Sequence, residues 1–172
     1  VAAVGSVIAA LGAAVTSVWM LSENNMSGFG GMIVLDGYSQ FFKVLIAAAL
    51  TLTTLFSVKR PNNEDIPRAE YHALLLLAST GMMLAVSAVD LLVLYLGLEL
   101  TTLCSYVLVG IRVERPLSNE AAMKYFLLAS FASAVFLYGI ALTYGFAGAT
   151  DFLTITAVIT DGGMENNATL LL

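Results

Sequence analysis

Five long apolar stretches constrain this chain more than any other feature of its sequence. Each is about 20 residues long, the length that an α-helix needs to cross the hydrocarbon core of a bilayer. We place the helices at residues 1–21, 38–58, 72–89, 91–111 and 119–146. Hydrophobic residues make up 59% of the chain and charged residues only 11%, whereas a soluble domain is about 25% charged. The sequence therefore predicts an all-α, polytopic membrane helix bundle, formed by residues 1–172 as a single membrane domain.

The basic residues fall mainly in two of the connections between these stretches. One connection joins the second and third helices, and the other joins the fourth and fifth. Their basic residues are Lys59, Arg60, Arg68, Arg112 and Arg115. The remaining connections contain acids but no Lys or Arg. The positive-inside rule then predicts that the two basic connections face the cytoplasm or the mitochondrial matrix.

Two shorter segments lack the length of a membrane span. GGMIVLDG, residues 30–37, predicts a small extended segment on the outer surface. DFLTITAVITD, residues 151–161, predicts an amphipathic helix lying at the membrane interface. Asp90 alone separates the third and fourth apolar stretches, so we expect a tight antiparallel hairpin in which Asp90 has a turn or capping role.

Small residues recur at a spacing of four, which lets helix backbones approach closely in lipid. Such pairs are Gly81 with Ala85 on the third helix, and Ala129 with Ser133 and Ser130 with Ala134 on the fifth. This spacing favours a packed bundle over separate anchors, and it carries no information about chemistry.

An acid lies inside the fourth apolar stretch. Glu99 is near the middle of LLVLYLGLELTTLCSYVLVGI, residues 91–111. A charge at the bilayer centre costs about 2.5–3.5 kcal/mol on insertion scales, so such residues usually face a bundle interior or water. Tyr95, Thr102 and Tyr106 share the helix face of Glu99, and this polar stripe predicts ordered water. We interpret Glu99 as a switchable proton site; the alternative is a protonated Glu that only binds a neighbouring helix.

Two lysines also lie within predicted helices. Lys124 is near the start of the fifth helix, closer to the inner face than Glu99. From the residues alone, a role in a proton path is weighed equally against an ion pair with Glu120, four residues earlier, and against snorkelling to the interface. Lys43 is near the outer end of the second helix, where snorkelling is favoured.

Other classes of site find no support in the sequence. Cys104 is the single cysteine and is expected to be a buried, inert thiol. One Cys and one His, His72, make no metal cluster, and we expect His72 at a helix end near water. There is no glycine-rich phosphate loop, no nucleophile paired with a base, and no basic patch large enough for nucleic acid. We therefore expect no metal, cofactor or nucleic acid on this chain, and any redox chemistry on another.

Part of the sequence resembles a known family. YLGLELTTLCSYVLVGI, residues 95–111, and SNEAAMKYFLLASFASAVFLYGIALTYG, residues 118–145, are similar to the antiporter-like membrane subunits of respiratory complex I. The closest resemblance is to the subunit N type, called subunit 2 of NADH dehydrogenase in mitochondria. Residues 70–100 and MIVLDGYSQFF, residues 32–42, also look like that family. The resemblance extends from about residue 32 to residue 151.

The resemblance implies a larger fold of two inverted helical repeats, of which this chain holds part. It implies that Glu99 matches a glutamate of the family's proton path and that Lys124 matches a lysine of the next helix, which raises the weight of a role for Lys124. A further lysine that pairs with the glutamate in the family has no counterpart here. We therefore expect a fragment or a subunit split between chains, in which a second chain carries the rest.

Function follows from this resemblance as an expectation. The main hypothesis is a proton-translocating membrane subunit of NADH:quinone oxidoreductase in the mitochondrial inner membrane or the bacterial plasma membrane. NADH, FMN, iron–sulfur clusters and quinone are then expected on partner subunits, and other membrane-arm subunits are expected as neighbours. The alternatives are a subunit of a multi-subunit cation/proton antiporter, and a structural membrane subunit without transport.

Overall fold

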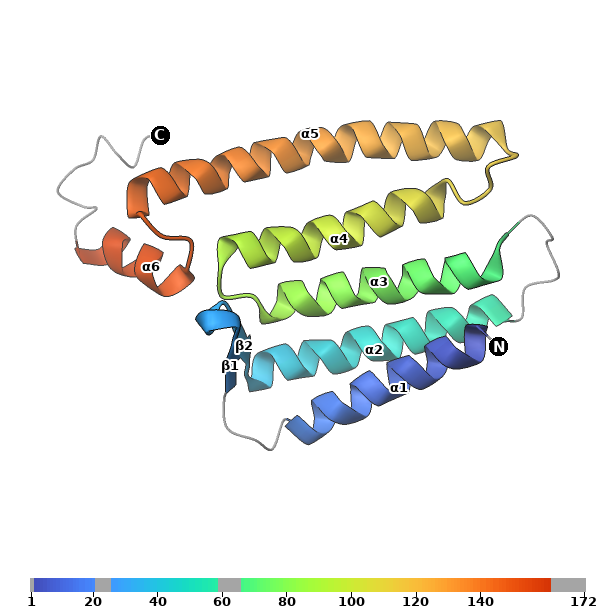
Figure 1. Cartoon of the computed structure of the whole chain (residues 1–172), viewed down its shortest axis with the longest axis horizontal. Coiled ribbons are helices and arrows are strands. Elements are labelled where there is room, and N and C mark those ends of the chain that lie inside the picture. The colour runs from blue at the N-terminus through green and yellow to red at the C-terminus, as the bar shows by residue number, and fades with distance from the viewer. Residues whose placement is uncertain (1, 21–25, 59–65, 162–172) are drawn as a thin grey trace.

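The computed structural model describes residues 2–20, 26–58 and 66–161 of the chain. Five helices in these ranges are long and apolar enough to cross a membrane, and successive helices run antiparallel (Figure 1). They are α1 (Ala2–Met20), α2 (Gly37–Val58), α3 (Arg68–Ser87), α4 (Leu91–Val109) and α5 (Pro116–Ala147). The predicted helical membrane bundle is confirmed, with its five helices at the expected places.

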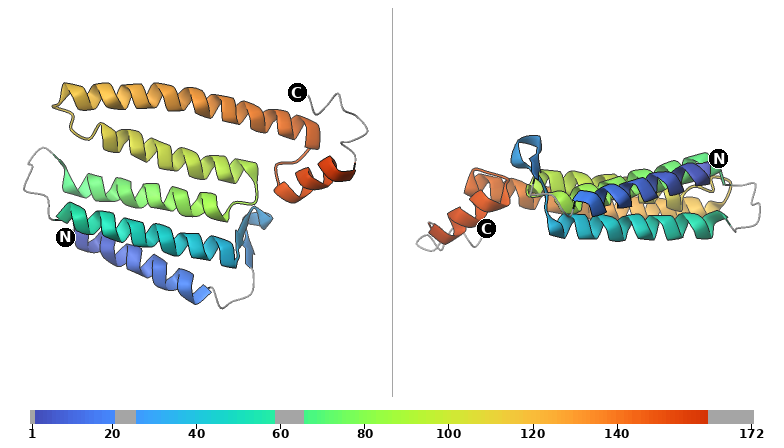
Figure 2. Two further views of the ribbon diagram at one scale, coloured as in Figure 1. Left: turned by 180° about the vertical axis from the view of Figure 1, so that it is seen from behind. Right: turned by 90° about the horizontal axis from the view of Figure 1, so that it is seen from below.

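Helices that follow one another in the chain also lie side by side. Each of α2 to α5 packs on the helix before it, and α1 also touches α3. Short connections impose this order because neighbouring elements pair most readily when little chain separates them. Seen from below, the helices form a thin layer with a hairpin and a short helix at one end (Figure 2).

The two ends of the bundle differ in charge. Arg68 begins α3 at the same end as the α4–α5 connection, which contains Arg112 and Arg115 (Figure 1). We call this the basic end, and the opposite end, with the hairpin, the hairpin end. Lys59 and Arg60 lie outside the described residues. The separation of charge agrees with the sequence pattern, and the side of the membrane that each end faces stays a prediction.

The ends of α3 differ from those expected. The helix begins at Arg68, four residues before His72, because Pro67 provides an extended N-cap and the polar residues that follow can all be helical. It ends at Ser87 because Ala88 is extended and pairs with Ile33 of the hairpin. Three residues therefore connect α3 and α4 rather than Asp90 alone.

A β-hairpin covers part of the hairpin end. Strand β2 (Ile33–Leu35) confirms the predicted extended segment, and it pairs antiparallel with β1 (Met26–Gly28), which the sequence did not reveal. A 3₁₀ turn, η1 (Phe29–Gly31), joins them, with a positive φ at all three of its residues. The two glycines at its end suit this backbone because they have no Cβ to clash.

Backbone hydrogen bonds join the connections at the hairpin end. Val89 N donates to Met32 O at 3.0 Å, and Phe152 N donates to Val89 O at 3.0 Å. Leu91 N donates to Thr150 O at 2.9 Å. The hairpin, the α3–α4 connection and the chain after α5 are thereby linked. The last of these leads into α6 (Phe152–Asp161), which confirms the short helix predicted there; its place at the interface stays a prediction.

The connection at the basic end also fastens α5 to α4. Ser118 Oγ donates to Val109 O at 2.7 Å. A Cβ added at Gly110 would lie 2.9 Å from the Cβ of Ala122 on α5, so the two helices meet closely here. Helix α5 is therefore attached to its neighbours at both ends.

The closest helix packing joins α3 and α4. A Cβ added at Gly97 would lie 2.7 Å from Ala85 N and 2.8 Å from Gly81 O. A Cβ added at Gly81 would lie 2.6 Å from Thr101 Oγ1. The predicted role of Gly81 and Ala85 in close packing is confirmed, because only a glycine at each crossing point lets the backbones approach this far.

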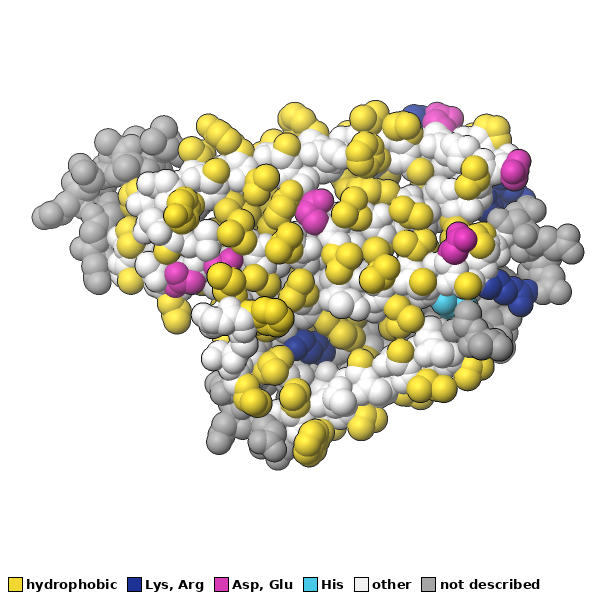
Figure 3. All heavy atoms as spheres, viewed as in Figure 1, with side chains coloured by type: hydrophobic (Ala, Val, Ile, Leu, Met, Phe, Trp, Pro, Cys, Tyr) yellow, Lys and Arg dark blue, Asp and Glu magenta, His cyan; other side chains and the backbone are white. Residues whose placement is uncertain are grey.

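The sides of the bundle are apolar. Phe131 and Leu128 of α5 are 74% and 75% exposed, and Phe56 of α2 is 73% exposed. Figure 3 shows apolar side chains over most of one face, with few charged side chains among them. Such a surface needs lipid or other apolar helices around it, because contiguous apolar patches of this extent are rare in water.

Candidate functional site

The carboxylate of Glu99 faces α5. It lies near the middle of α4, half-buried, two residues after the close-packed Gly97. Its Oε1 atom accepts a hydrogen bond from the hydroxyl of Ser133 on α5. The structure thus places this acid at a contact between two membrane-spanning helices, where its charge receives a polar partner.

A tyrosine from α4 reaches the same serine. The hydroxyl of Tyr95 lies 2.9 Å from Ser133 Oγ, and its ring packs on that of Phe136, with centroids 6.0 Å apart. Tyr95, Ser133 and Glu99 therefore form a continuous hydrogen-bonded group across the α4–α5 interface. In the sequence, Ser133 stands out only as a small residue, four positions after Ala129. The hydroxyl on an otherwise apolar stretch was the feature of the sequence that could have indicated a polar contact here.

Thr102 and Tyr106 are placed differently from Tyr95. The hydroxyl of Thr102 donates to backbone carbonyls of its own helix, Leu98 O at 3.1 Å and Glu99 O at 3.0 Å. Tyr106 is buried, and its ring makes edge contacts with aromatic rings of α5. The structure brings Tyr95 to the group around Glu99 and leaves the hydroxyls of these two residues outside it.

Lys124 points away from that group. It lies nine residues before Ser133 on α5, which is two and a half helical turns and about 14 Å along the axis. Its side chain is therefore on the opposite face of α5 from Ser133. Lys124 Nζ forms an ion pair with Glu120 Oε1 at 2.5 Å, and both side chains are more than half exposed. The pairing considered from the sequence is present, and no direct contact joins Lys124 to Glu99.

Lys43 lies on the packed side of α2. It is four residues from both Ser39 and Ala47, which are buried. Asp36, just before α2, is the acid whose charge acts on it. The expected snorkelling of Lys43 toward the hairpin end stays a prediction, and the side chain is half-buried rather than on the open surface of the bundle.

His72 and Cys104 are both buried. His72 is 6% exposed and lies in the second turn of α3 with Nδ1 3.4 Å from Ser6 Oγ of α1, so the expected place near water is wrong. The reason is the early start of α3, which carries His72 into the helix packing. Cys104 is 5% exposed, as expected. Within the described residues no group of His, Cys, Asp and Glu could hold a metal ion.

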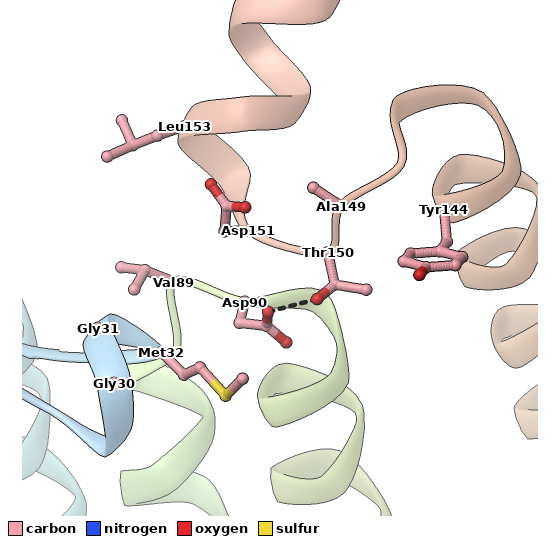
Figure 4. A pocket seen from close by; sticks show the side chains of 10 residues that line it. All are labelled: Gly30, Gly31, Met32, Val89, Asp90, Tyr144, Ala149, Thr150, Asp151 and Leu153. Carbon is pink, nitrogen blue, oxygen red and sulfur yellow. Dashed lines mark hydrogen bonds between the residues drawn. The ribbon is translucent and has the colours of Figure 1, made fainter.

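A pocket of about 420 Å³ lies at the hairpin end between η1, the α3–α4 connection and the start of α6 (Figure 4). Asp90 lies in its wall and is 2% exposed. Its Oδ1 accepts from Leu92 N at 2.8 Å and from Val93 N at 3.3 Å, and its Oδ2 accepts from Thr150 Oγ1 at 2.6 Å. The expected capping role of Asp90 is confirmed, and both of its carboxylate oxygens accept hydrogen bonds within the protein.

Two acids next to this end titrate below their usual range. The backbone N–H of Ser39 donates to Asp36 Oδ1 at 2.8 Å, and this hydrogen bond lowers the pKa of Asp36. Hydrogen bonds from Thr154 lower the pKa of Asp151. Each acid lies at a helix start, where free N–H groups and the helix dipole favour a negative charge.

Known proteins resemble this chain in sequence. Residues 88–172 match the family described as "NADH:quinone oxidoreductase/Mrp antiporter, TM". The NADH-quinone oxidoreductase subunit N 2 of Rhizobium meliloti is 41% identical over 160 residues, covering 93% of this chain and 33% of that protein. Subunit N of Desulfovibrio desulfuricans is 46% identical over 147 residues, covering 84% of this chain and 29% of that protein. The chain spans about a third of the length of these curated relatives.

Solved structures share the fold. A chain of respiratory complex I from Thermus thermophilus matches with a TM-score of 0.74 and 31% identity, over 87% of this chain and 32% of that one. A chain of an archaeal membrane-bound sulfane sulfur reductase matches with a TM-score of 0.79 and 24% identity, over 91% of this chain and 34% of that one. The helix arrangement and the sequence relatives agree, and this chain belongs to the family of antiporter-like membrane subunits typified by subunit N of NADH-quinone oxidoreductase.

Proposed function

We propose that this chain is part of a proton-translocating membrane subunit of an NADH:quinone oxidoreductase. Glu99 is the proton site. It takes up a proton when the charge or hydration around it favours the neutral acid, and it releases the proton when they favour the carboxylate. Electron transfer elsewhere in the complex supplies that change.

The observation that carries this proposal is the contact of Glu99 with Ser133. An ionisable side chain within a membrane span is costly unless it serves a pathway or has partners. Glu99 has one partner on the facing helix and remains half-buried rather than sealed. A group in that state can exchange a proton with water or with a neighbouring site, whereas a fully enclosed acid could not.

Lys124 is proposed as a second site of the same path. Its ammonium group is held by Glu120 and faces away from the α4–α5 contact. A proton that leaves Glu99 must therefore travel around or past α5, through water or through side chains of neighbouring elements. A proton lost from Lys124 would break this ion pair and leave Glu120 without it.

In this proposal the redox cofactors and the other membrane-arm helices belong to other polypeptides. NADH, FMN, iron–sulfur clusters and quinone are bound by partner subunits, and the chain contacts other membrane-arm subunits and lipid. The basic end faces the cytoplasm or the mitochondrial matrix. The curated relatives are subunits of NADH-quinone oxidoreductase by name, which supports this assignment over others.

A second candidate function is a subunit of a multi-subunit cation/proton antiporter. The description of the matching family names the Mrp antiporter beside the oxidoreductase, and this keeps the candidate open. In that case proton transport would respond to sodium, and no NADH dehydrogenase would be attached. A structural subunit whose buried charges carry no protons is a third candidate.

The decisive experiment replaces Glu99 by Gln in the intact complex. Gln keeps the shape and the hydrogen-bond acceptor but cannot ionise, so the variant should assemble normally and move fewer protons per NADH oxidised. Glu114→Gln, the same change in the α4–α5 connection, is the matched control and should pump normally. Normal pumping by Glu99→Gln would remove Glu99 from the path.

A native gel identifies the assembly. Mildly solubilised membranes are separated, stained for NADH dehydrogenase activity, and searched for this chain by mass spectrometry. Recovery in the large active band supports the oxidoreductase. Recovery in a separate band together with antiporter subunits would make the second candidate the function.

A further inference from the structure

We propose that Ser133 is a positioning residue that reserves one oxygen of Glu99, Oε2, for the transported proton. The proposal rests on the role given to Glu99 above. It assigns a role to a residue of α5 that has no charge and that spacing alone marks only as small.

Counting protons fixes the direction of the hydrogen bonds. An ionised carboxylate can only accept, so Ser133 Oγ–H donates to Glu99 Oε1. A serine hydroxyl has one proton, and that proton is then in use. The hydroxyl of Tyr95, 2.9 Å away, must therefore donate to Ser133 Oγ. The order of donation is therefore Tyr95 to Ser133 to Glu99.

The two oxygens of Glu99 are not equivalent. Oε1 is occupied by Ser133, while Oε2 receives no hydrogen bond from the described part of the chain. An arriving proton forms an O–H bond at Oε2, and Oε1 becomes the carbonyl oxygen that still accepts from Ser133. Release breaks the same O–H bond and returns the proton to its carrier. Ser133 and Tyr95 keep their own protons throughout.

Packing holds the donors in place. The ring of Tyr95 rests against Phe136, one turn beyond Ser133 on α5. This ring contact therefore orients the Tyr95 hydroxyl toward Ser133, which in turn meets the carboxylate of Glu99.

No other described charge competes at this point. Helix α3 has no ionisable side chain from residue 73 to residue 87. On α5, Glu120 and Lys124 lie on the face opposite Ser133, and Tyr125 packs against Tyr106 nearer the basic end. On α4, Cys104 is buried further along the helix. Among the described residues, Ser133 and Tyr95 are therefore the groups that form the hydrogen-bonded chain to Glu99.

Infrared difference spectroscopy of the intact complex tests this assignment. The carbonyl band of protonated Glu99 is recognised as the band that Glu99→Gln removes. Ser133→Ala should shift this band to higher wavenumber, because the carbonyl loses its hydrogen bond.

Three variants separate positioning from general damage. Ser130→Ala, one turn earlier on α5, removes a hydroxyl that makes no hydrogen bond with the described residues and should leave the band unchanged. Ser133→Thr keeps the hydroxyl and should restore the wild-type position of the band. Tyr95→Phe removes the outer donor and should shift the band in the same direction as Ser133→Ala, but by less.

Each outcome bears on one proposal. An unshifted band in Ser133→Ala, in a complex where Glu99→Gln abolishes pumping, would overturn the role of Ser133 and leave Glu99 as the proton site. A shifted band together with normal pumping by Glu99→Gln would support the hydrogen-bonded group and overturn the transport role on which it rests. A failure of Ser133→Thr to restore the band would likewise count against the hydroxyl.

Discussion

Thr150 donates a 2.6 Å hydrogen bond to the carboxylate of Asp90, a residue sixty positions earlier in the chain. The same carboxylate caps the first turn of α4 through Leu92 N and Val93 N. One buried acid therefore starts a membrane-spanning helix and fixes the segment that follows α5. Asp90 therefore has a structural role, although it is an acid in the wall of a pocket.

Asp90→Ala should loosen this end of the bundle. The change removes the cap of α4, which is worth about 1 kcal/mol, and deprives the half-buried Thr150 of its acceptor. We expect faster hydrogen exchange at the amides of Leu92 and Val93, measured by mass spectrometry of the detergent-solubilised complex. Asp90→Asn keeps an acceptor oxygen and should exchange at a rate closer to wild type. Unchanged exchange in Asp90→Ala would show that the backbone hydrogen bonds alone hold this end of the bundle together.

Gly97→Ala should destabilise the α3–α4 pair. The new Cβ would lie 2.7 Å from Ala85 N, a backbone atom that cannot swing aside. The helices must separate, at a cost of about 1–3 kcal/mol for such overpacking. Thermal inactivation of the complex measures the effect. Gly139→Ala is the control, because its Cβ would meet nothing within 4 Å. Equal inactivation temperatures for the two variants would contradict the close crossing.

The stability of the start of α2 should depend on pH because of Asp36. Its pKa is lowered in the folded chain by the hydrogen bond from Ser39 N. The stabilisation is therefore fully present above the unfolded pKa, about 3.9, and is lost as the pH falls through the lower folded value. Protection of the Ser39 amide, corrected for intrinsic exchange, should drop in that acid range. Asp36→Asn keeps the acceptor without the titration, and its protection should stay level; a parallel drop in both would point to another group.

Lys124→Ala should reduce proton translocation without reducing stability. The ion pair with Glu120 is exposed and spans one helical turn, so its loss costs about 0.5 kcal/mol or less. A clear fall in protons moved per NADH, at an unchanged inactivation temperature, would therefore report a role in transport. Glu120→Gln, which removes the partner and keeps the lysine, should have the smaller effect. Full pumping in Lys124→Ala would indicate that Lys124 has no role in transport and only forms a surface ion pair with Glu120.

The helices were predictable because the membrane imposes a length on each apolar run. The residues at which the helices begin and end were less predictable. Arg68 and the polar residues after it belong to α3 but fall outside its apolar block, and hydropathy alone gives them no helical signal. Strand β1 is a three-residue MSG segment without strand periodicity. It exists because β2 and a turn with positive φ values hold it in place, and these are tertiary effects.

The candidate site shows a similar division. The composition of the membrane spans indicated Glu99, and helical periodicity placed Tyr95 beside it. The orientation of α5 could not be read in this way, because small residues occur on two of its faces, at Ala129 with Ser133 and at Ser130 with Ala134. Once the structure shows which face meets α4, the same periodicity places Lys124 on the far side.

The two attachments of α5 have a mechanical consequence. The helix is 32 residues long, fastened to α4 at the basic end and to Asp90 at the hairpin end. A rod clamped at both ends bends most easily at its middle, and Ser133 lies close to that point. A charge appearing or vanishing on Glu99 thus pulls on the most compliant part of α5, where a small force produces the largest sideways displacement.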